Sequence, residues 1–433
     1  MHVQVKQLKE KSQAELAISV PARDFEAYIE RAAKELTKDK PLKGFRPGKA
    51  PLNIVMEVFG QERVLHEAVE RALPHFFVQA AVDEEVEAIN KPSVTITTLG
   101  LEKPFEFTAK VDVLPEVQVA DVKKLAVEER NVAVKDEEVE QELTRIAKMR
   151  AKPLEVVRGA QAGDVVTVDF DVQMNGATIP GGSSKNHPVE LGEGHFVPDF
   201  EKGLTGVRAG EERTFEMGFP ADYAKKDVAG QKAQVHVKAH SVQQLVLPAL
   251  DDAFAKSLGK FENIADLKGK LRENIQHEKD HKESDRRRSE LMEKLAEAST
   301  FGFIPEILIE REIDSRLQEL AQMLTLQQKT IEDYLKKQSK TVKQLRADLR
   351  KSAERAVKVG IAMRAFAKEQ NIEVTDEEIE AQTQEYLARF KNTKVATKEI
   401  NPDKLREDIT LVLRNQKALD KLEELAGFEP HRH

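Results

Sequence analysis

Residues 191–204 read LGEGHFVPDFEKGL, and they lie in a stretch whose composition decides the fold predicted for the middle of the chain. Glycines cluster between residues 155 and 243, and short runs such as 166–172, 215–219 and 235–239 alternate apolar with other side chains. Such alternation is typical of strands that bury one face, and Asn175-Gly176 is a strong hairpin signal. We therefore predict a small antiparallel β domain here.

The sequence before this domain mixes strand and helix patterns. Apolar residues alternate over 14–20, 94–99 and 105–111, which predicts three strands, and they recur at helical spacing from Phe25 to Leu36. These patterns predict an α+β domain over residues 1–113.

A bridge follows this α+β domain and precedes the glycine-rich stretch. It is predicted to be extended from Pro115 to Val134. Val139 and Leu143 then begin the apolar face of a charged amphipathic helix. The bridge is therefore a separate segment, residues 114–151.

After the β domain, glycine nearly vanishes and helix formers dominate. Apolar residues have helical spacing over Ile309–Leu324, Leu345–Ala367 and Leu405–Leu425. Thr375-Asp-Glu-Glu378 matches a capping box at the start of another helix. The sequence thus predicts an α+β multidomain protein, with these parts: an α+β domain (1–113), a bridge (114–151), an antiparallel β domain (152–245) and an all-α region (246–433).

The composition limits the functions that the chain can perform. Its 433 residues contain 68 Lys and Arg against 76 Asp and Glu, a net charge of −8, so the whole chain is not an electrostatic nucleic-acid binder. The absence of Cys excludes disulfides, thiolate zinc sites, iron–sulfur clusters and a Cys nucleophile. No stretch approaches the ~20 apolar residues of a membrane span. The N-terminus lacks an apolar signal-peptide core, so we expect a cytoplasmic protein that does not engage a membrane.

A basic segment, residues 34–51, stands out on this acidic chain. Its second half, Gly44-Phe45-Arg46-Pro47-Gly48-Lys49-Ala50-Pro51, is called the tip below. Glycines let the backbone turn and prolines restrict it, so the tip presents one aromatic ring among cations. Such a surface suits a partner with phosphates or acidic side chains. An ordinary solvated basic loop is the alternative that charge alone favours.

The tip motif, Gly-Phe-Arg-x-Gly-Lys-x-Pro, resembles the ribosome-docking signature of the trigger factor family of bacterial chaperones. It lies in an N-terminal α+β domain, and a β domain and a helical region follow in that family's order, so the resemblance covers nearly the whole chain. The resemblance implies that the chain docks near the nascent-chain exit, against ribosomal protein and rRNA. The residues that it implies for this contact are Gly44, Phe45, Arg46, Gly48, Lys49 and Pro51.

The same resemblance implies partners and roles beyond docking. The chain would hold nascent and unfolded polypeptides, form homodimers away from the ribosome, and serve protein export and cell division. The bridge helix and the C-terminal helices would form one discontinuous body with the β domain inserted in it. We expect the helical region to supply most of the holding surface, with Phe301–Ile309 and Met323–Leu326 as candidate contact segments.

Three motifs of the β domain are similar to those of FK506-binding-type prolyl isomerases: Val168-Asp-Phe170, residues 191–204 and Phe219-Pro-x-x-Tyr223. In that family a bent sheet wraps a short helix, which corresponds here to Pro198–Leu204, and a dry pocket between them binds a proline side chain. The pocket positions that the resemblance assigns are Phe170, Ile179, Phe196, Val197, Phe200, Tyr223 and Val237. Without the resemblance, the apolar residues among them would be interpreted as ordinary core.

The chemistry of such a pocket needs neither a nucleophile nor a metal. The barrier to X–Pro isomerisation, ~18–20 kcal/mol, arises because rotation breaks amide resonance. The resemblance implies that the Val197 N–H anchors a substrate carbonyl. Ile179, Lys225 and Val237 stand where the family often has aromatic residues, so we expect a weak prolyl isomerase. A chaperone whose isomerase domain is vestigial is the alternative.

One motif points to a different class of enzyme. His277-Glu-Lys-Asp-His281 matches the His-Glu-x-x-His pattern of zinc metallopeptidases. The charged run that continues to Arg288 indicates a solvated face rather than a helix beside a cleft, so a metallopeptidase is a remote alternative. The sequence has no Gly-x-x-x-x-Gly-Lys-Ser/Thr phosphate loop. We therefore expect no ATP-driven cycle, no cofactor and no metal.

Overall fold

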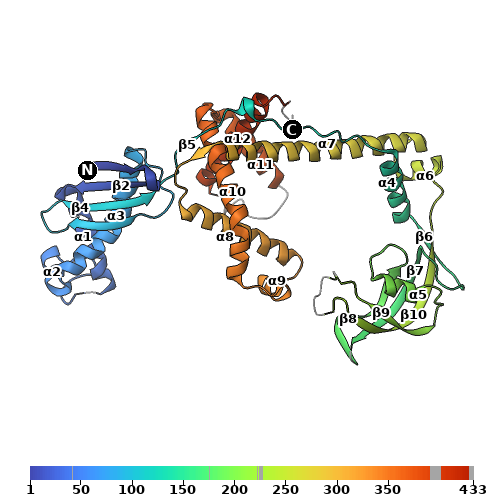
Figure 1. The fold of residues 1–433 in the computed structure, drawn as a ribbon. Coiled ribbons are helices and arrows are strands. Elements are labelled where there is room, and N and C mark those ends of the chain that lie inside the picture. The colour runs from blue at the N-terminus through green and yellow to red at the C-terminus, as the bar shows by residue number, and fades with distance from the viewer. Residues whose placement is uncertain (41, 175, 222, 224–227, 391–400, 429–433) are drawn as a thin grey trace. The chain divides into compact units, whose positions relative to one another are not determined.

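The computed structural model describes residues 1–40, 42–174, 176–221, 223, 228–390 and 401–428 (Figure 1). The chain divides into two compact units, Met1–Glu128 with Arg287–His433, and Glu129–Arg286. The second unit is therefore inserted into the sequence of the first. In the described residues, no helix combines the length and the apolar character that a membrane span requires.

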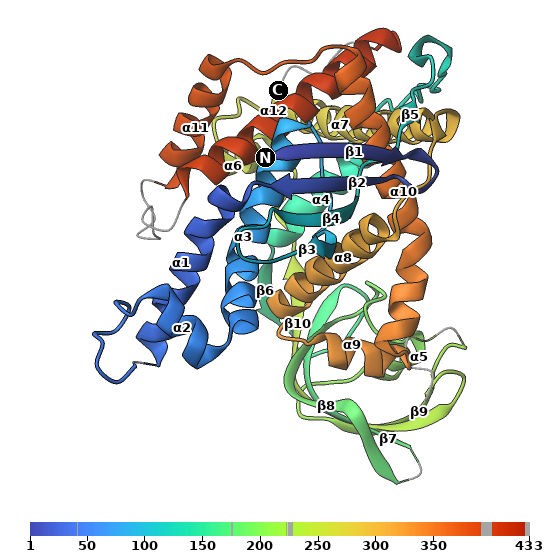
Figure 2. The ribbon, with the colours of Figure 1, turned by 90° about the vertical axis from the view of Figure 1, so that its left-hand side faces the viewer.

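The N-terminal domain of the first unit is an antiparallel sheet with helices packed on it (Figure 2). Its strands in sheet order are β1 (His2–Leu8), β2 (Gln13–Val20), β4 (Phe105–Asp112) and β3 (Ser93–Thr98). Alternate residues of β2 and β4 are buried in one core with helices α1 (Ala22–Asp39) and α3 (Gln61–Asp83). The predicted strands and helix are confirmed. Strand β1 was not predicted, because Val3 and Val5 of this edge strand are a weak apolar signal.

The C-terminal part of the first unit is helical, as predicted. Its helices are α7 (Ile264–Ala298), which begins in the second unit, α8 (Glu306–Leu326), α9 (Ile331–Gln338), α10 (Val342–Glu369), α11 (Asp376–Phe390) and α12 (Pro402–Leu425). The predicted capping box is confirmed: the Thr375 N–H donates to the Glu378 carboxylate over 2.8 Å, and the Glu378 N–H donates to the Thr375 hydroxyl over 3.4 Å. A buried ion pair between Arg288 and Glu423, 2.9 Å long, joins α7 to α12.

The segment that leads out of the N-terminal domain runs along these helices. Strand β5 (Val117–Gln118) pairs with β11 (Thr300–Phe301), and a short 3₁₀ helix follows at Val122–Lys124. Val122 is buried among residues of α7, α10 and α12. The predicted extended bridge is confirmed for most of its length.

The β domain of the second unit is a five-stranded sheet packed on one short helix (Figure 1). Its strands are β6 (Lys152–Glu155), β10 (Lys232–Val246), β7 (Asp164–Met174) and β8 (Ala177–Glu190) in sheet order, with β9 (Glu212–Gly218) beside β10. A register shift between Ala239 and Ser241 bends β10 where its outer partner changes from β9 to β6. Helix α5 (Pro198–Leu204) has the bounds that the sequence predicted, and it buries Phe200 and Leu204.

The bridge helix α4 (Asp136–Met149) confirms the predicted amphipathic helix. Its buried residues Val139, Leu143 and Ala147 pack on α6 (Asp252–Leu258) and on the first turns of α7. Helix α4 is thus a structural part of the helical segment that follows the β domain in sequence.

Asp164, the first residue of β7, has a buried carboxylate that binds residues of the segment leading into this strand. Its oxygens accept hydrogen bonds from the Arg158 guanidinium over 2.5 and 3.0 Å and from the Gln161 N–H over 2.8 Å. The Arg158 hydrogen bonds are the main reason why the pKa of Asp164 lies below its usual value, and the Gln161 N–H lowers that pKa further. The ionised carboxylate therefore stabilises the folded state.

We predict that Asp164→Asn lowers the free energy of opening of β7 and β10 by about 1.5–3 kcal/mol at neutral pH, because it removes hydrogen bonds to a charged group. The folded-state pKa of Asp164 lies below the unfolded value of about 3.9. The advantage of the native residue is therefore complete above that value and is lost as the pH falls through the folded-state pKa. Hydrogen exchange of amides in the two strands against urea concentration measures this difference.

The matched control is Glu216→Gln, which breaks an exposed pair with Lys232 on the same domain. It should change the opening free energy by no more than about 0.5 kcal/mol. Equal losses in the two variants, or an Asp164→Asn loss that persists unchanged in acid, would contradict the assignment.

Candidate functional site

A cavity of about 460 Å³ lies in the β domain, between the sheet and α5. Strands β7, β8 and β9, the loop before α5 and the segment after β9 all contribute to its wall. The side chains that line it are mostly apolar or aromatic, and the larger of them are Phe170, Val172, Ile179, His195, Phe196, Val197, Phe200, Met217, Phe219, Tyr223 and Val228. A cavity of this size and lining suits an apolar ring rather than an ion.

Stacked and edge-on phenylalanine rings form the floor of this cavity. Phe200 is buried, and its ring centroid lies 5.1 Å from that of Phe196, nearly parallel, and 5.4 Å from that of Phe170, edge-on. Phe215 supports Phe200 from behind at 6.2 Å. Gly203 permits this contact, because a Cβ there would lie 2.3 Å from the Phe215 ring.

The structure brings most of the predicted pocket residues together. Those that line the cavity are Phe170, Ile179, Phe196, Val197, Phe200 and Tyr223. Val237 does not line it. Although β10 places Val237 opposite Phe170 on β7, its short side chain ends in the core of the domain, where it is 4% exposed. Lys225 lies outside the described residues.

The Val197 N–H has no hydrogen-bond acceptor among the described residues, so it is available to bind a substrate. Val197 immediately precedes α5, and its carbonyl accepts a hydrogen bond from the Phe200 N–H over 2.8 Å. Within the described part of the chain, no group accepts a hydrogen bond from the Val197 N–H itself. This donor lies on a residue that lines an apolar cavity, so a carbonyl that entered the cavity mouth would satisfy it.

Several cavity residues were not assigned from the sequence. Met217 was recognised only as part of an alternating strand, and Val172 only as a neighbour of Phe170 on β7. Phe219 was recognised as the start of the motif that ends at Tyr223, but it was not assigned to the pocket. Their alternation could have identified them, since every second residue of these strands faces inward. His187 carried no signal either. It is not among the side chains that line the cavity, but its ring meets those of two that do, Phe170 and Phe196, edge-on at 5.8 and 5.6 Å.

The carboxylate of Glu201 binds the loop that carries His195 and Phe196 through two backbone N–H groups. Glu201 on α5 accepts hydrogen bonds from the Gly192 N–H over 3.0 Å and from the Phe196 N–H over 3.3 Å. Gly192 and Gly194 have φ of 95° and 71°, a backbone conformation that glycine adopts without strain. The part of the cavity wall that this loop forms therefore depends on contacts to the loop rather than on a regular element.

The tip in the N-terminal domain is built from two tight turns. The Phe45 N–H donates to the Leu42 carbonyl and the Lys49 N–H to the Arg46 carbonyl, over 3.1 and 3.0 Å. Gly44 and Gly48 have the positive φ, 91° and 72°, that the third position of a type II turn requires. Pro47 stands at the second position of the second turn.

These turns leave most tip side chains accessible to a partner. Phe45 is 39% exposed, and Arg46, Lys49 and Pro51 are exposed as well. Gly48 is buried against α1, where a Cβ would lie 3.2 Å from Lys38. The tip leads into α2 (Leu52–Phe59), and both views show this segment at the end of α1 away from the sheet (Figures 1 and 2). The predicted contact residues thus lie together, except that Gly48 shapes the turn rather than presenting a surface.

The His-Glu-x-x-His motif lies on α7. His281 pairs with Asp285 one turn further along the helix, 2.9 Å apart. No cluster of three His, Asp or Glu side chains suitable for a metal ion occurs among the residues that the structure describes. The geometry of this motif therefore offers no support for the metallopeptidase alternative.

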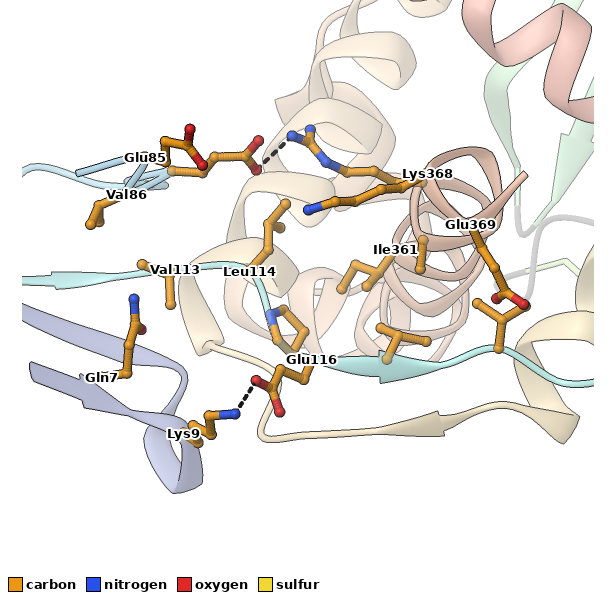
Figure 3. Close-up of a pocket in the computed structure, with 16 residues that line it drawn as sticks. Gln7, Lys9, Glu85, Val86, Val113, Leu114, Glu116, Ile361, Lys368 and Glu369 are labelled. Carbon is orange, nitrogen blue, oxygen red and sulfur yellow. Dashed lines mark hydrogen bonds and ion pairs between the residues drawn. The ribbon is translucent and has the colours of Figure 1, made fainter. Parts of the chain in front are cut away.

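A larger cavity, of about 700 Å³, lies in the first unit where the N-terminal domain and β5 approach α10 (Figure 3). Ion pairs cross it or flank it, between Lys9 and Glu116 (2.6 Å) and between Glu87 and Arg364 (2.7 Å). Its floor includes Ile361 of α10. Because charges of both signs line it, it has no clear preference for a cation or an anion.

Family models match nearly the whole chain. The N-terminal model "Bacterial trigger factor protein (TF)" matches residues 1–146, and the model of its C-terminus matches residues 263–424. The model "FKBP-type peptidyl-prolyl cis-trans isomerase" matches residues 157–243, which contain the whole aromatic cavity. A trigger factor of Moorella thermoacetica is 35% identical over 92% of this chain and 88% of its own.

The chain belongs to the trigger factor family. A trigger factor of Halalkalibacterium halodurans is also similar, with 34% identity over 94% of this chain and 95% of its own. A solved trigger factor chaperone structure has 22% identity and a TM-score of 0.48 over 97% of this chain and 99% of that chain, which is too distant to add to the assignment. As a trigger factor, this protein is a chaperone of the family with an FKBP-type domain between its N- and C-terminal parts.

Proposed function

We propose that this trigger factor is an ATP-independent chaperone of the cytoplasm that docks at the ribosomal exit through its tip. There it keeps new polypeptides open and unaggregated for folding and export, and it isomerises their X–Pro bonds in the β-domain cavity. The observation that carries the isomerase part is the aromatic cavity with an unpartnered Val197 N–H at its edge.

The cavity supplies what X–Pro isomerisation requires. A proline ring would rest on Phe196 and Phe200, whose flat faces exclude water from the amide that twists. A twisted amide loses resonance and carries less charge on its oxygen, so it is stabilised more by a dry environment than the planar amide is. The Val197 N–H would bind a flanking carbonyl and hold the substrate in place. Ile179 leaves one wall without a ring, which favours weak activity.

We predict that Phe196→Ala in the full chain lowers kcat/KM for a short X–Pro peptide by roughly tenfold, since loss of the ring removes about 1.4 kcal/mol of contact in the transition state. Ile179→Phe should raise kcat/KM, because it completes the aromatic wall. The uncatalysed reaction takes tens to hundreds of seconds, so a weak catalyst is measurable in a peptide assay.

Phe261→Ala is the control, because Phe261 is another partly buried phenylalanine of the second unit and packs with α4 rather than with the cavity. It should leave kcat/KM unchanged. If the folded native chain does not accelerate isomerisation at all, the alternative of a vestigial isomerase domain is supported instead. The lack of an aromatic ring at Ile179 already argues against a strong isomerase.

The tip supplies local positive charge on an acidic chain. Lys43, Arg46 and Lys49 are exposed around Phe45 and project from the turns between α1 and α2. Phosphates of rRNA and acidic side chains of ribosomal protein both complement this surface. The stiff turns lower the entropy that the tip loses when it binds.

We predict that Arg46→Ala with Lys49→Ala weakens co-sedimentation with ribosomes, and that adding Phe45→Ala weakens it further. Binding of the native chain should fall as salt rises, because counterions screen phosphate contacts. The control removes two exposed cations of the same domain, Lys6→Ala with Arg23→Ala, and should sediment like the native chain. Equal binding by tip and control variants would refute the docking assignment.

The helical segments expose apolar side chains that could hold an unfolded chain. Within the predicted contact segments, Phe303, Met323 and Leu326 are 56%, 52% and 88% exposed, whereas Ile309 and Leu324 are buried in the core. On α12, Leu411 and Val412 are 52% and 63% exposed. Exposed apolar surface of this kind marks sites that bind other chains.

We predict that Met323→Ser with Leu326→Ser, and separately Leu411→Ser with Val412→Ser, reduces suppression of client aggregation. Each residue buried against a client is worth about 1 kcal/mol of binding free energy. Light scattering of an aggregating client measures the effect. Val78→Ser with Val82→Ser alters two exposed valines of α3 and should have little effect. If this N-terminal pair matters most, the holding surface lies elsewhere.

A further inference from the structure

Helix α4 is firmly joined to α6 and to the first half of α7. Besides its apolar contacts with α6 and α7, its acidic face pairs with basic residues of α7: Asp136 with Arg272, Glu140 with Lys268, and Glu138 with Lys279 over 2.6 Å. A displacement of α7 relative to the β domain therefore carries α4 with it.

In the last turn of α4, Lys148 pairs with two carboxylates of the β domain. The Lys148 ammonium lies 3.5 Å from the Glu190 carboxylate, at the end of β8, and pairs more closely with Glu193. Glu193 lies between the two left-handed glycines of the loop that ends at Val197. Lys148 and Glu201 thus contact the same loop: Lys148 through the side chain of Glu193, and Glu201 through backbone N–H groups.

This loop is a wall of the candidate isomerase cavity. Gly194, His195, Phe196 and Val197 all line the cavity, and they follow Glu193 directly in the chain. A shift of Glu193 is passed along these few residues to the Phe196 ring and the Val197 N–H. No helix or strand stands between Glu193 and the cavity to absorb such a shift.

We propose that Lys148 is a positioning residue for the isomerase cavity, and that its pairs with Glu193 and Glu190 couple the helix α4 to the loop 191–197. The proposal rests on the isomerase function proposed above. Through this contact, a load on the helical segments, such as a bound polypeptide, would alter the cavity without touching it.

The electrostatics of the contact suit such a role. The hydrogen bond from Lys148 lowers the pKa of Glu193, and Glu193 is the main reason why the pKa of Lys148 lies above its usual value. Both groups therefore stay charged throughout the neutral range, and pH changes there do not break the pair. The side chains of Lys148 and Glu193 are each 36% exposed, so salt does weaken it. A half-exposed pair is weak enough to open under load.

The test compares full-length variants with the native chain by two readouts. One is amide hydrogen exchange of residues 193–197, and the other is kcat and KM for an X–Pro peptide at low and high salt. The variants are Lys148→Ala, the conservative Lys148→Arg, and the swap of Lys148→Glu with Glu193→Lys. The control is Arg145→Ala, which breaks a pair with Glu142 on the same helix, 2.8 Å long, without touching the β domain.

We expect Lys148→Ala to speed exchange in the loop and to lower kcat/KM by roughly two- to fivefold at low salt, the size that loss of an exposed pair allows. The loss should appear mainly in KM and should shrink at high salt. Lys148→Arg should restore both readouts, and the charge swap should restore them in part, because it also places a carboxylate near Glu190. Arg145→Ala should leave both unchanged.

The outcomes separate this proposal from the isomerase function on which it rests. If the native chain isomerises peptides and Lys148→Ala changes neither exchange nor kcat/KM, the coupling is refuted while the isomerase stands. If the chain shows no isomerase activity but loop exchange responds to Lys148 as expected, the isomerase fails while the mechanical coupling stands. Faster exchange in Arg145→Ala as well would show a general effect of α4 and refute the specific contact.

Discussion

The pairing of β10 with three other strands is the constraint on which the second unit depends. Its inner edge holds β7 along most of its length, while its outer edge holds β9 first and β6 after the register shift. Because one strand sets all three registers, Phe170 of β7 and Met217 of β9 face the same interior as α5. The cavity is then what remains between a bent sheet and a helix too short to fill it.

Local signals in the sequence were enough to predict β7, β9 and α5 around this cavity, but β8 was indicated only by the hairpin signal that precedes it. Pro198 begins α5 because a proline suits the first turn of a helix, and the alternation of β7 and β9 follows from one buried face. Val237 does not line the cavity: β10 pairs with β7 beside it, and the residues that line the cavity come from β7, β8, β9, α5 and the adjoining loops. Register is a long-range property that one sequence does not reveal.

Contacts between elements were also beyond the sequence. The tip could be predicted, since its charges, glycines and prolines are contiguous and act through local turns. The pair of Lys148 with Glu193 joins residues far apart in the chain, and nothing in either local sequence sets them apart from other exposed charges. The full extent of α7 was missed for a related reason, as its charged residues interrupt the apolar stripe that marks a helix.

The two candidate sites make opposite physical demands, and they belong to separate units. In the proposed function, the tip would work through exposed charge and would need water and counterions around it before docking. The cavity works by excluding water and carries few charged side chains. The tip lies between α1 and α2 in the first unit, and the cavity lies in the second unit.

The central claim is that the aromatic cavity receives the prolyl ring of a client chain. The most direct measurement is a titration of the full-length protein with a short X–Pro peptide, followed by nuclear magnetic resonance of the aromatic and methyl groups. The account predicts that signals of Phe170, Ile179, Phe196 and Val197 shift together with one dissociation constant, while the signal of Phe261, which packs with α4, stays in place. Shifts confined to the helical segments, with the cavity signals unmoved, would contradict it.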